Sequence, residues 1–401
     1  MTAAHRPLQQ TCSSDFVIYY KKIAFALQKT KRIQNYRYTL SKRTGFCYNS
    51  GKETAYRRKN ERGSYIMKKV LCMVLALCMI CTVAISCASA EGKKIRVGMV
   101  TDVGGVNDKS FNQTSWEGLQ ALAAEDDSFE VNYLESKTDA DYQTNINTFI
   151  DEGYDLIICV GYMLADATKD AATENPDQLF AIIDDSTCAD LPNVACLMFA
   201  QEQASYLVGL VAGSVTKSKT VGYVQGMVSD TMNLFGIGYI SGVLEVCPDA
   251  TVLQYNANNF GDIAGGTTAA KDMITKGADV IYHAAGGTGM GVINACGEEG
   301  IWAIGVDTDQ SNLDPDHVIT SAMKRVDVAS QDISKAVKDG AFTSGVHLYD
   351  LSNGGVDLAP TRDHIPADVL EVVEAAKAAI IAGEKTVPTT VAECPAFTLG
   401  E

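Results

Sequence analysis

Several signatures of catalysis are absent from the 401-residue sequence. There is no Gly-x-Ser-x-Gly nucleophile elbow, no His-Glu-x-x-His metal site and no Gly-Lys-Ser/Thr phosphate loop. Histidine occurs five times, without the spacing of metal ligands. These absences argue against a serine hydrolase, a zinc enzyme and a phosphate-loop NTPase. A pair of carboxylates far apart in the sequence leaves no such signature, so an enzyme of that kind stays open at this point.

The charge is divided unevenly along the chain. Residues 1–66 carry 14 Lys and Arg against 3 Asp and Glu, whereas residues 67–401 carry 19 against 46. Binding of nucleic acid depends on basic side chains that displace the counterions of the phosphates. We therefore expect no nucleic-acid partner for the acidic part.

A secretory signal is indicated at residues 67–87. Met67 is followed by two lysines, an apolar run of about 16 residues and then small residues. The run is short for a membrane span, which needs about 20 apolar residues. A signal anchor is the alternative. Met67 is the expected start of translation, and residues 1–66 are interpreted as an upstream, non-native extension.

Two cleavage rules compete after this signal. The sequence before Cys87 has the small residues of a bacterial lipobox but lacks the preferred Leu three positions earlier, and residues 88–90 would suit ordinary signal peptidase. We favour lipidation of Cys87, because several acyl chains together hold a protein stably on a membrane. Six cysteines follow, without a Cys-x-x-Cys motif, and are expected to be buried free thiols.

Short apolar runs alternate with helical patterns from about residue 95 onward. The predicted strands fall in two series, at residues 95–100, 129–134, 156–160, 179–183 and 194–199, and at residues 221–224, 251–255, 280–283, 302–306 and 318–322. Alternation of this kind predicts parallel sheets with helices on both faces. Two series of about five strands predict an α/β protein with two lobes. The tail adds a strand at 346–349 and a helix at 367–382.

Several predicted strands end in glycine or acidic residues. In open α/β sheets, ligands bind beyond the carboxyl ends of the strands. One such end is the loop 104–112, where Asn107 and Asp108 supply polar groups and Phe111 is unusual in such a polar setting. A turn that caps the next helix explains this loop equally well.

Other strand ends offer further candidates. The glycine-rich loop at 284–291 permits close approach of the backbone to a ligand. Asp307 and Lys324 suit the hydroxyls of a sugar, although a surface ion pair is the plain alternative. Phe235 and Tyr239 share one helix face, for which packing is the plain explanation.

These residues as a set resemble the basic membrane protein family, the substrate-binding lipoproteins of ABC importers, and most closely its purine-nucleoside receptors. The similarity spans about residues 93–395 and is most characteristic in the run Asn-Asp-Lys-Ser-Phe-Asn at 107–112. It implies the type I periplasmic-binding-protein fold, with two Rossmann-like lobes around a ligand cleft. The first lobe is expected to hold residues 93–199 and 323–343, and the second residues 200–322 and 344–395.

The resemblance also implies roles for individual residues. Phe111 and Phe235 would enclose the base, with Tyr239 as a possible substitute for Phe235. The remaining expected contacts are Asn107, Asp108 and Asp184 with the base, Gly286 and Gly287 near the sugar, and Asp307 and Lys324 with the ribose hydroxyls.

The implied function is capture of a purine nucleoside by hinge closure and delivery to an ABC permease. The protein is expected to act as a monomer on the extracytoplasmic face, anchored through Cys87, without catalysis, metal or cofactor. Riboflavin or another ribose-bearing ligand is an alternative cargo. A ligand-sensing surface receptor and a nucleoside hydrolase are alternatives from other functional classes.

Overall fold

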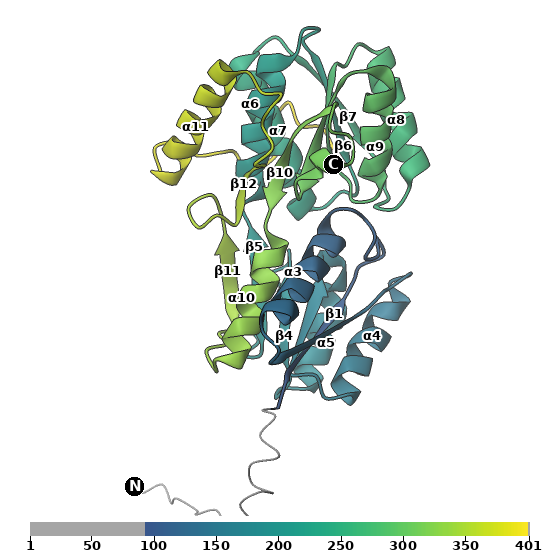
Figure 1. Ribbon diagram of the computed structural model, residues 1–401, viewed down its shortest axis with the longest axis vertical. Helices are drawn as coiled ribbons and strands as arrows, with labels where there is room; N and C mark the ends of the chain where they lie inside the picture. Colours follow the sequence, from purple (N-terminus) through teal and green to yellow (C-terminus); the bar gives the residue numbers. More distant parts are fainter. Residues whose placement is uncertain (1–92, 400–401) are drawn as a thin grey trace, which may run out of the picture. The chain divides into compact units, whose positions relative to one another are not determined.

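The structure is a computed structural model that describes residues 93–399. The expected upstream extension, the signal at 67–87 and Cys87 lie outside these residues. The described part contains two lobes, each built around a six-stranded sheet (Figure 1). The first lobe comprises β1 (Ile95–Val100), α3 (Phe111–Glu125), β2 (Phe129–Leu134), α4 (Ala140–Asp151), β3 (Leu156–Val160), η1 (Tyr162–Leu164), α5 (Ala165–Glu174), β4 (Leu179–Ile183), β5 (Val194–Phe199), α10 (Val326–Lys338) and β11 (Gly345–Tyr349).

The second lobe holds the remaining elements. They are α6 (Gln201–Val215), β6 (Thr220–Gln225), α7 (Asp230–Val246), β7 (Thr251–Asn256), α8 (Ile263–Thr275), β8 (Val280–Ala284), α9 (Thr288–Glu299), β9 (Trp302–Asp307), η2 (Gln310–Asn312), β10 (Val318–Lys324), β12 (Val356–Leu358) and α11 (Ala367–Ile381). The predicted α/β class with two lobes and the type I periplasmic-binding arrangement are therefore observed.

The first sheet has the strand order β11-β5-β4-β3-β1-β2, and every neighbouring pair is parallel. All five residues of β3 are buried, as expected for a strand that has helices on both faces. The strands β3, β4 and β5 are nearly continuous apolar runs, which is why their predicted and observed bounds coincide. In β2, apolar and polar residues alternate instead, and this alternation also predicts a strand.

The second sheet has the order β12-β10-β9-β8-β6-β7, and only β12 runs antiparallel to its neighbour. Glycines bring α6 and α7 together in this lobe. A Cβ atom at Gly238 or Gly242 would lie 2.2 Å from a backbone oxygen of α6, that of Glu202 or Tyr206. The two helices therefore pack backbone against backbone, which no larger residue would permit.

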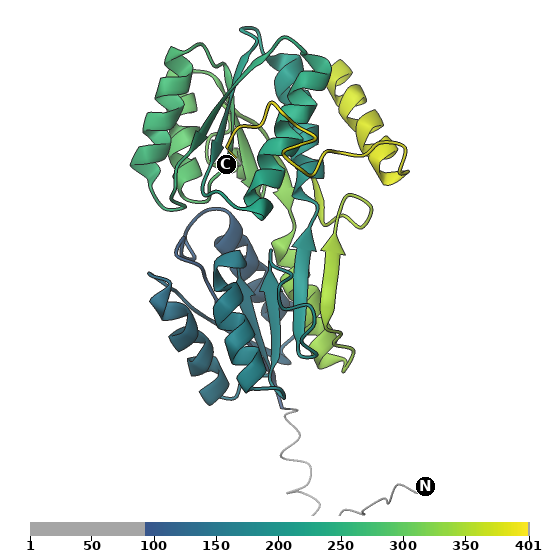
Figure 2. The ribbon, with the colours of Figure 1, turned by 180° about the vertical axis from the view of Figure 1, so that it is seen from behind.

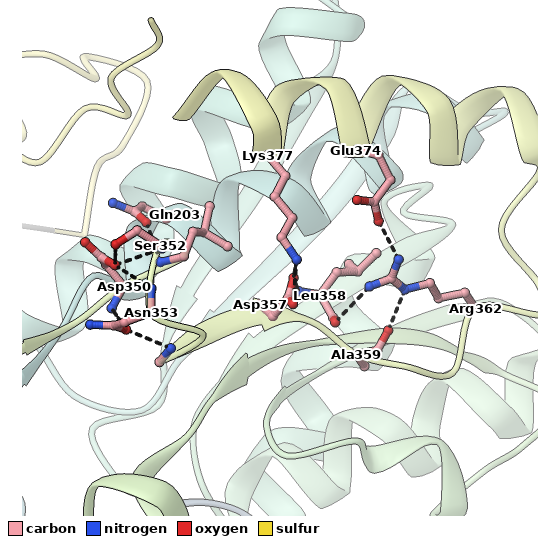
Figure 3. A network of polar contacts seen from close by, with 12 residues as sticks. Gln203, Asp350, Ser352, Asn353, Asp357, Leu358, Ala359, Arg362, Glu374 and Lys377 are labelled. Carbon is pink, nitrogen blue, oxygen red and sulfur yellow. Dashed lines mark hydrogen bonds and ion pairs between the residues drawn. The ribbon is translucent and has the colours of Figure 1, made fainter. Parts of the chain in front are cut away.

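Three chain segments connect the lobes, after β5, after β10 and after β11. They are bonded to one another, because the amide of Ala200 donates to Tyr349 and that of Arg325 to Gly355, both at 2.9 Å. Figure 3 shows the third segment, in which the Gln203 carboxamide accepts from the amide of Leu351 at 3.0 Å. These hydrogen bonds hold the three connecting segments together between the lobes.

Two expected lobe boundaries are wrong. The expected first lobe begins again at residue 323, but β10 of the second sheet extends to Lys324. The expected second lobe includes residues 344–395, but β11 pairs in parallel with β5 of the first lobe. The chain therefore crosses after Tyr349 and not before residue 344. The reason is that an isolated five-residue strand carries no sequence signal for which sheet edge it joins.

The cysteines after the predicted signal follow the prediction of buried free thiols. The six in the described residues are Cys159, Cys188, Cys196, Cys247, Cys296 and Cys394, and all are free and buried. Within residues 93–399, no helix has the length and apolar character needed to cross a membrane.

Candidate ligand-binding site

A pocket lies between the lobes, where the carboxyl ends of strands from both sheets meet. The first lobe lines it with Asp102, Asp108, Phe111, Asn112, Gly161, Tyr162 and Asp184. The second lobe lines it with Met232, Phe235, Phe260, Ala284, Ala285, Gly286, Val306, Asp307 and Lys324. Acidic groups and aromatic rings thus line the same pocket, as in sites that orient a flat polar ligand.

The first lobe holds its loop after β1 in place through two carboxylates. Asp108 accepts from the amides of Ser110, Asn112 and Gln113 at 2.9, 2.8 and 3.1 Å, so it caps α3. Asp102 accepts from the Gly104 amide and the Asn112 carboxamide, both at 2.8 Å. Burial raises the pKa of Asp102 to about 6 and also raises that of Asp108, although these hydrogen bonds oppose the change.

A buried ion pair crosses the pocket between the lobes. The Lys324 ammonium at the end of β10 donates to Oδ2 of Asp184, which follows β4. Burial raises the pKa of Asp184, against the lowering effect of Lys324. The second oxygen of the carboxylate, Oδ1, is buried and accepts no hydrogen bond. An unbonded buried acceptor costs free energy, so the pocket offers one place that a ligand donor would stabilise.

Three aromatic rings surround the Lys324 ammonium. Its Nζ lies 5.0 Å from the ring centroid of Phe111, 5.1 Å from that of Phe199 and 5.2 Å from that of Phe235. These distances allow cation–π attraction. Phe111 and Phe235 come from different lobes, so the expected pair of rings is brought to the same point of the pocket.

A second contact between the lobes involves Asp307. The Ser110 hydroxyl of the first lobe donates to Oδ2 of Asp307, and beside it the Gln310 carboxamide donates to the Lys109 carbonyl at 2.8 Å. Burial raises the pKa of Asp307 to about 7, with Lys324 and Ser110 acting in the opposite direction. The carboxyl is therefore near its titration point at neutral pH.

Both carboxylates that reach across the pocket sit on strained backbone. Asp184 has φ +68° and Asp307 has φ +66°, in the left-handed region that few residues other than glycine occupy. Strain of this kind persists where the surrounding structure holds it, and it concentrates at functional sites. The strain thus supports a binding role for these two strand ends.

The glycine-rich loop after β8 lies under an aromatic residue that the sequence did not single out. Gly286 has φ +53° and lines the pocket. Gly287 does not line it, and a Cβ atom there would lie 3.2 Å from the Phe260 carbonyl oxygen. Phe260 also fits against Gly226, where a Cβ atom would lie 2.4 Å from the ring. The loop 257–262 therefore closes this side of the pocket.

Seven of the nine expected ligand contacts line the pocket: Asp108, Phe111, Asp184, Phe235, Gly286, Asp307 and Lys324. Asn107 is exposed and lies outside its lining, as does Gly287. Tyr239 is fully buried in the core, 5.0 Å from the Tyr282 ring, which leaves Phe235 as the ring at the pocket.

The other lining residues had weak sequence signals. Phe260 is an aromatic residue in a polar loop after a strand, the same signal that drew attention to Phe111. Tyr162 begins η1, directly after Gly161, the residue that follows β3. Among residues 93–399, no group of three or more His, Cys, Asp or Glu side chains is arranged so that it could hold a metal ion.

Comparison with known proteins bears on this site. The family model described as ABC transporter substrate-binding protein PnrA-like matches residues 95–391. The CD4+ T-cell-stimulating antigen of Listeria monocytogenes is 40% identical over 317 residues, covering 74% of this chain and 88% of that protein. The ABC transporter nucleoside-binding protein BmpA of Lactococcus lactis is 39% identical, covering 74% and 89%.

A solved structure extends the comparison to the fold. The solute-binding protein of an ABC transporter system from Aeropyrum pernix superposes with a TM-score of 0.68 at 29% identity, covering 74% of this chain and 94% of that one. The two-lobed fold, the pocket between the lobes and the sequence similarity all indicate the same family. The chain belongs to the basic membrane protein family of PnrA-like substrate-binding proteins of ABC transporters.

Proposed function

We propose that this protein binds a purine nucleoside in the pocket between its lobes and delivers it to an ABC permease. The observation that carries the proposal is Asp184, which lines the pocket together with Phe111 and Phe235 and whose buried Oδ1 accepts no hydrogen bond. A carboxylate oxygen accepts from the ring N–H groups of guanine or hypoxanthine, and the two rings provide apolar faces for the base. The nucleoside-binding relative from Lactococcus lactis supports this choice of ligand.

The ribose would lie toward Asp307 and Gly286. A carboxylate accepts from vicinal hydroxyls, and a ribose hydroxyl would replace the Ser110 hydroxyl that donates to Asp307. Lys324 would keep its bond to Asp184 or move to the sugar. Asp108 would act on the ligand through the position of α3, since its oxygens already accept from the backbone.

The proposed role is binding without catalysis. The lobes would close over the ligand about the three connecting segments, and the ligand would stabilise the closed form by contacting both lobes. Lipidation at Cys87 would hold the protein on the outer face of the membrane beside the permease. The protein would work there as a monomer.

A thermal-shift panel tests the ligand. Residues 91–401 form one compact unit and would be refolded free of co-purified ligand, then mixed with inosine, guanosine, adenosine, free ribose and riboflavin. A nucleoside at 1,000 times its dissociation constant adds about 4 kcal/mol of stability. That corresponds to a rise of several degrees, at about 2–4 °C per kcal/mol.

The outcomes separate the alternatives. A shift with the nucleosides but not with ribose supports the proposal, and a shift with riboflavin alone changes the cargo. No shift with any ligand contradicts nucleoside binding. Release of free base during incubation with inosine, followed by chromatography, would contradict binding without catalysis.

A further inference from the structure

The chain after α11 crosses the second lobe as a strap, defined here as residues 383–399. It contains no helix or strand, and Figure 2 shows it in yellow as it runs across the lobe from α11 to the C-terminal end. Side chains fix it at several points. The Lys385 ammonium donates to the Tyr206 hydroxyl and to Glu245, which belong to α6 and α7.

The strap ends on an aromatic anchor, Phe397, which is 2% exposed. The carboxamide of Gln254 on β7 bonds the backbone on both sides of Phe397. It donates to the Ala396 carbonyl at 2.7 Å and accepts from the Thr398 amide at 2.9 Å. The Phe397 amide also donates to the Cys394 carbonyl at 2.9 Å. A residue held this firmly has a defined position, although it lies in irregular chain near the terminus.

Phe397 packs on the helix that carries two residues of the pocket. A Cβ atom at Gly236 of α7 would lie 2.4 Å from Cε2 of Phe397 and 2.6 Å from Cε1 of Tyr223. The neighbouring residue Phe235 lines the pocket, as does Met232 one turn earlier. Successive helix residues differ by roughly 100° in direction, so Phe397 supports α7 on a side other than the one that faces the pocket.

We propose that Phe397 is a positioning residue for ligand binding, which holds α7 so that the Phe235 ring faces the pocket. The proposal rests on the proposed function, because it requires that Phe235 contacts the ligand. The glycine at 236 is explained by the same contact, since any side chain there would displace the Phe397 ring and shift the helix. The strap thereby connects the C-terminal end of the chain to the binding site.

The test uses the full chain with F397A and a matched control. Phe129 is also a buried core phenylalanine, 3% exposed, but it begins β2 in the first lobe and does not line the pocket. We expect F397A to accelerate amide hydrogen exchange in α7. Inosine binding should weaken about tenfold, because a displaced Phe235 ring would lose part of the stacking energy of the base. F129A should lower stability but change inosine affinity less than about twofold.

A double-mutant cycle shows whether the effect passes through Phe235. Adding F397A to F235A should cause no further loss of affinity, whereas independent effects would add. F397L, which keeps apolar volume, should recover part of the affinity and serves as the main variant if F397A does not fold. The proposal is overturned if F397A and F129A have the same affinity, or if the two losses add in full.

Failure of the proposed function would be distinguishable from failure of this inference. If the wild-type protein binds no purine nucleoside, the ligand assignment fails, and the part of the inference that concerns affinity fails with it. The exchange measurement then still decides whether Phe397 holds α7. If the wild type binds inosine and F397A leaves α7 exchange unchanged, only the positioning role of Phe397 is rejected.

Discussion

The first lobe bonds most of its carboxylates at the pocket within itself, whereas the second lobe bonds Asp307 and Lys324 to groups of the first. Asp108 and Asp102 accept from amides of their own loop and helix. Asp307 accepts from Ser110, and Lys324 donates to Asp184, both across the pocket. The first lobe therefore holds most of its side of the pocket in place by its own hydrogen bonds. The polar side chains of the second lobe obtain their partners only through contact between the lobes.

The proposed hinge motion would affect the two lobes differently. Separation of the lobes would leave Asp307 and Lys324 without these partners, so that they would bond to water or to a ligand, whereas the cap of α3 would be unaffected. Buried charged groups need such partners, because their desolvation is costly. Under the proposed function, the second lobe is accordingly the side on which contacts to the ligand and contacts between the lobes would compete.

The largest expected effect comes from removing Lys324. K324M leaves Asp184 as a buried charge without its partner, and breaking a buried pair in this way costs about 3–5 kcal/mol. Denaturation with urea at pH 7 measures the loss in the free energy of unfolding. The control is K219M, which breaks a pair with Asp249 whose side chains are 57% and 65% exposed, so water already solvates both charges and the loss should be much smaller than in K324M.

The double variant D184N/K324M sharpens this test. Because it removes both charges, it should recover much of the stability lost in K324M. Equal losses for K324M and K219M would show that the ion pair between the lobes is not a significant contact, and the comparison of the lobes would lose its main support.

The next effect is a pH dependence that originates in Asp307. Its pKa of about 7 in the folded protein is above the usual value of 3.8, so the folded state holds its proton more tightly than the unfolded state. Its contribution to stability is present below about pH 4 and is lost as the pH rises to about 7. The maximum slope for one group is about 1.4 kcal/mol per pH unit.

D307N should therefore flatten the decline of unfolding free energy between pH 4.5 and 7.5, measured by urea denaturation at several pH values. Part of the decline should remain, since burial also raises the pKa of Asp102 to about 6. D141N is the control, because hydrogen bonds from the amides of Lys137 and Thr138 lower the pKa of this exposed carboxyl. An unchanged profile in D307N would contradict the assignment.

The smallest expected effect concerns the hydrogen bonds that Asp108 accepts within the first lobe. D108A removes the acceptor for three backbone amides at the start of α3 and should cost about 0.5–2 kcal/mol, as for other helix caps. D166A is the control, since Asp166 is an exposed acid in the first turn of α5, which has no side-chain cap. Urea denaturation that shows equal costs for both variants would remove the capping role of Asp108.

The parts of the fold that the sequence predicts are those that depend on local hydrophobic patterns. The bounds of β3, β4 and β5 follow from the sequence because their buried residues form continuous apolar runs. Phe111 and Phe235 were identified through the family resemblance, and the structure places both at the pocket. Phe260 was overlooked, since only the folding back of loop 257–262 over Gly226 and Gly286 brings its ring to the pocket.

The sequence by itself determined the α/β class, the alternation of strands and helices and the set of acidic and aromatic residues at strand ends, because these follow from local periodicity. Only the tertiary structure decided that Lys324 pairs with Asp184, 140 residues away, and that β11 joins the first sheet. It likewise placed Phe397 behind α7. The physical reason is that contacts across the pocket depend on the order of the strands in each sheet and on how the two lobes meet. The local sequence around each residue contains no signal for either.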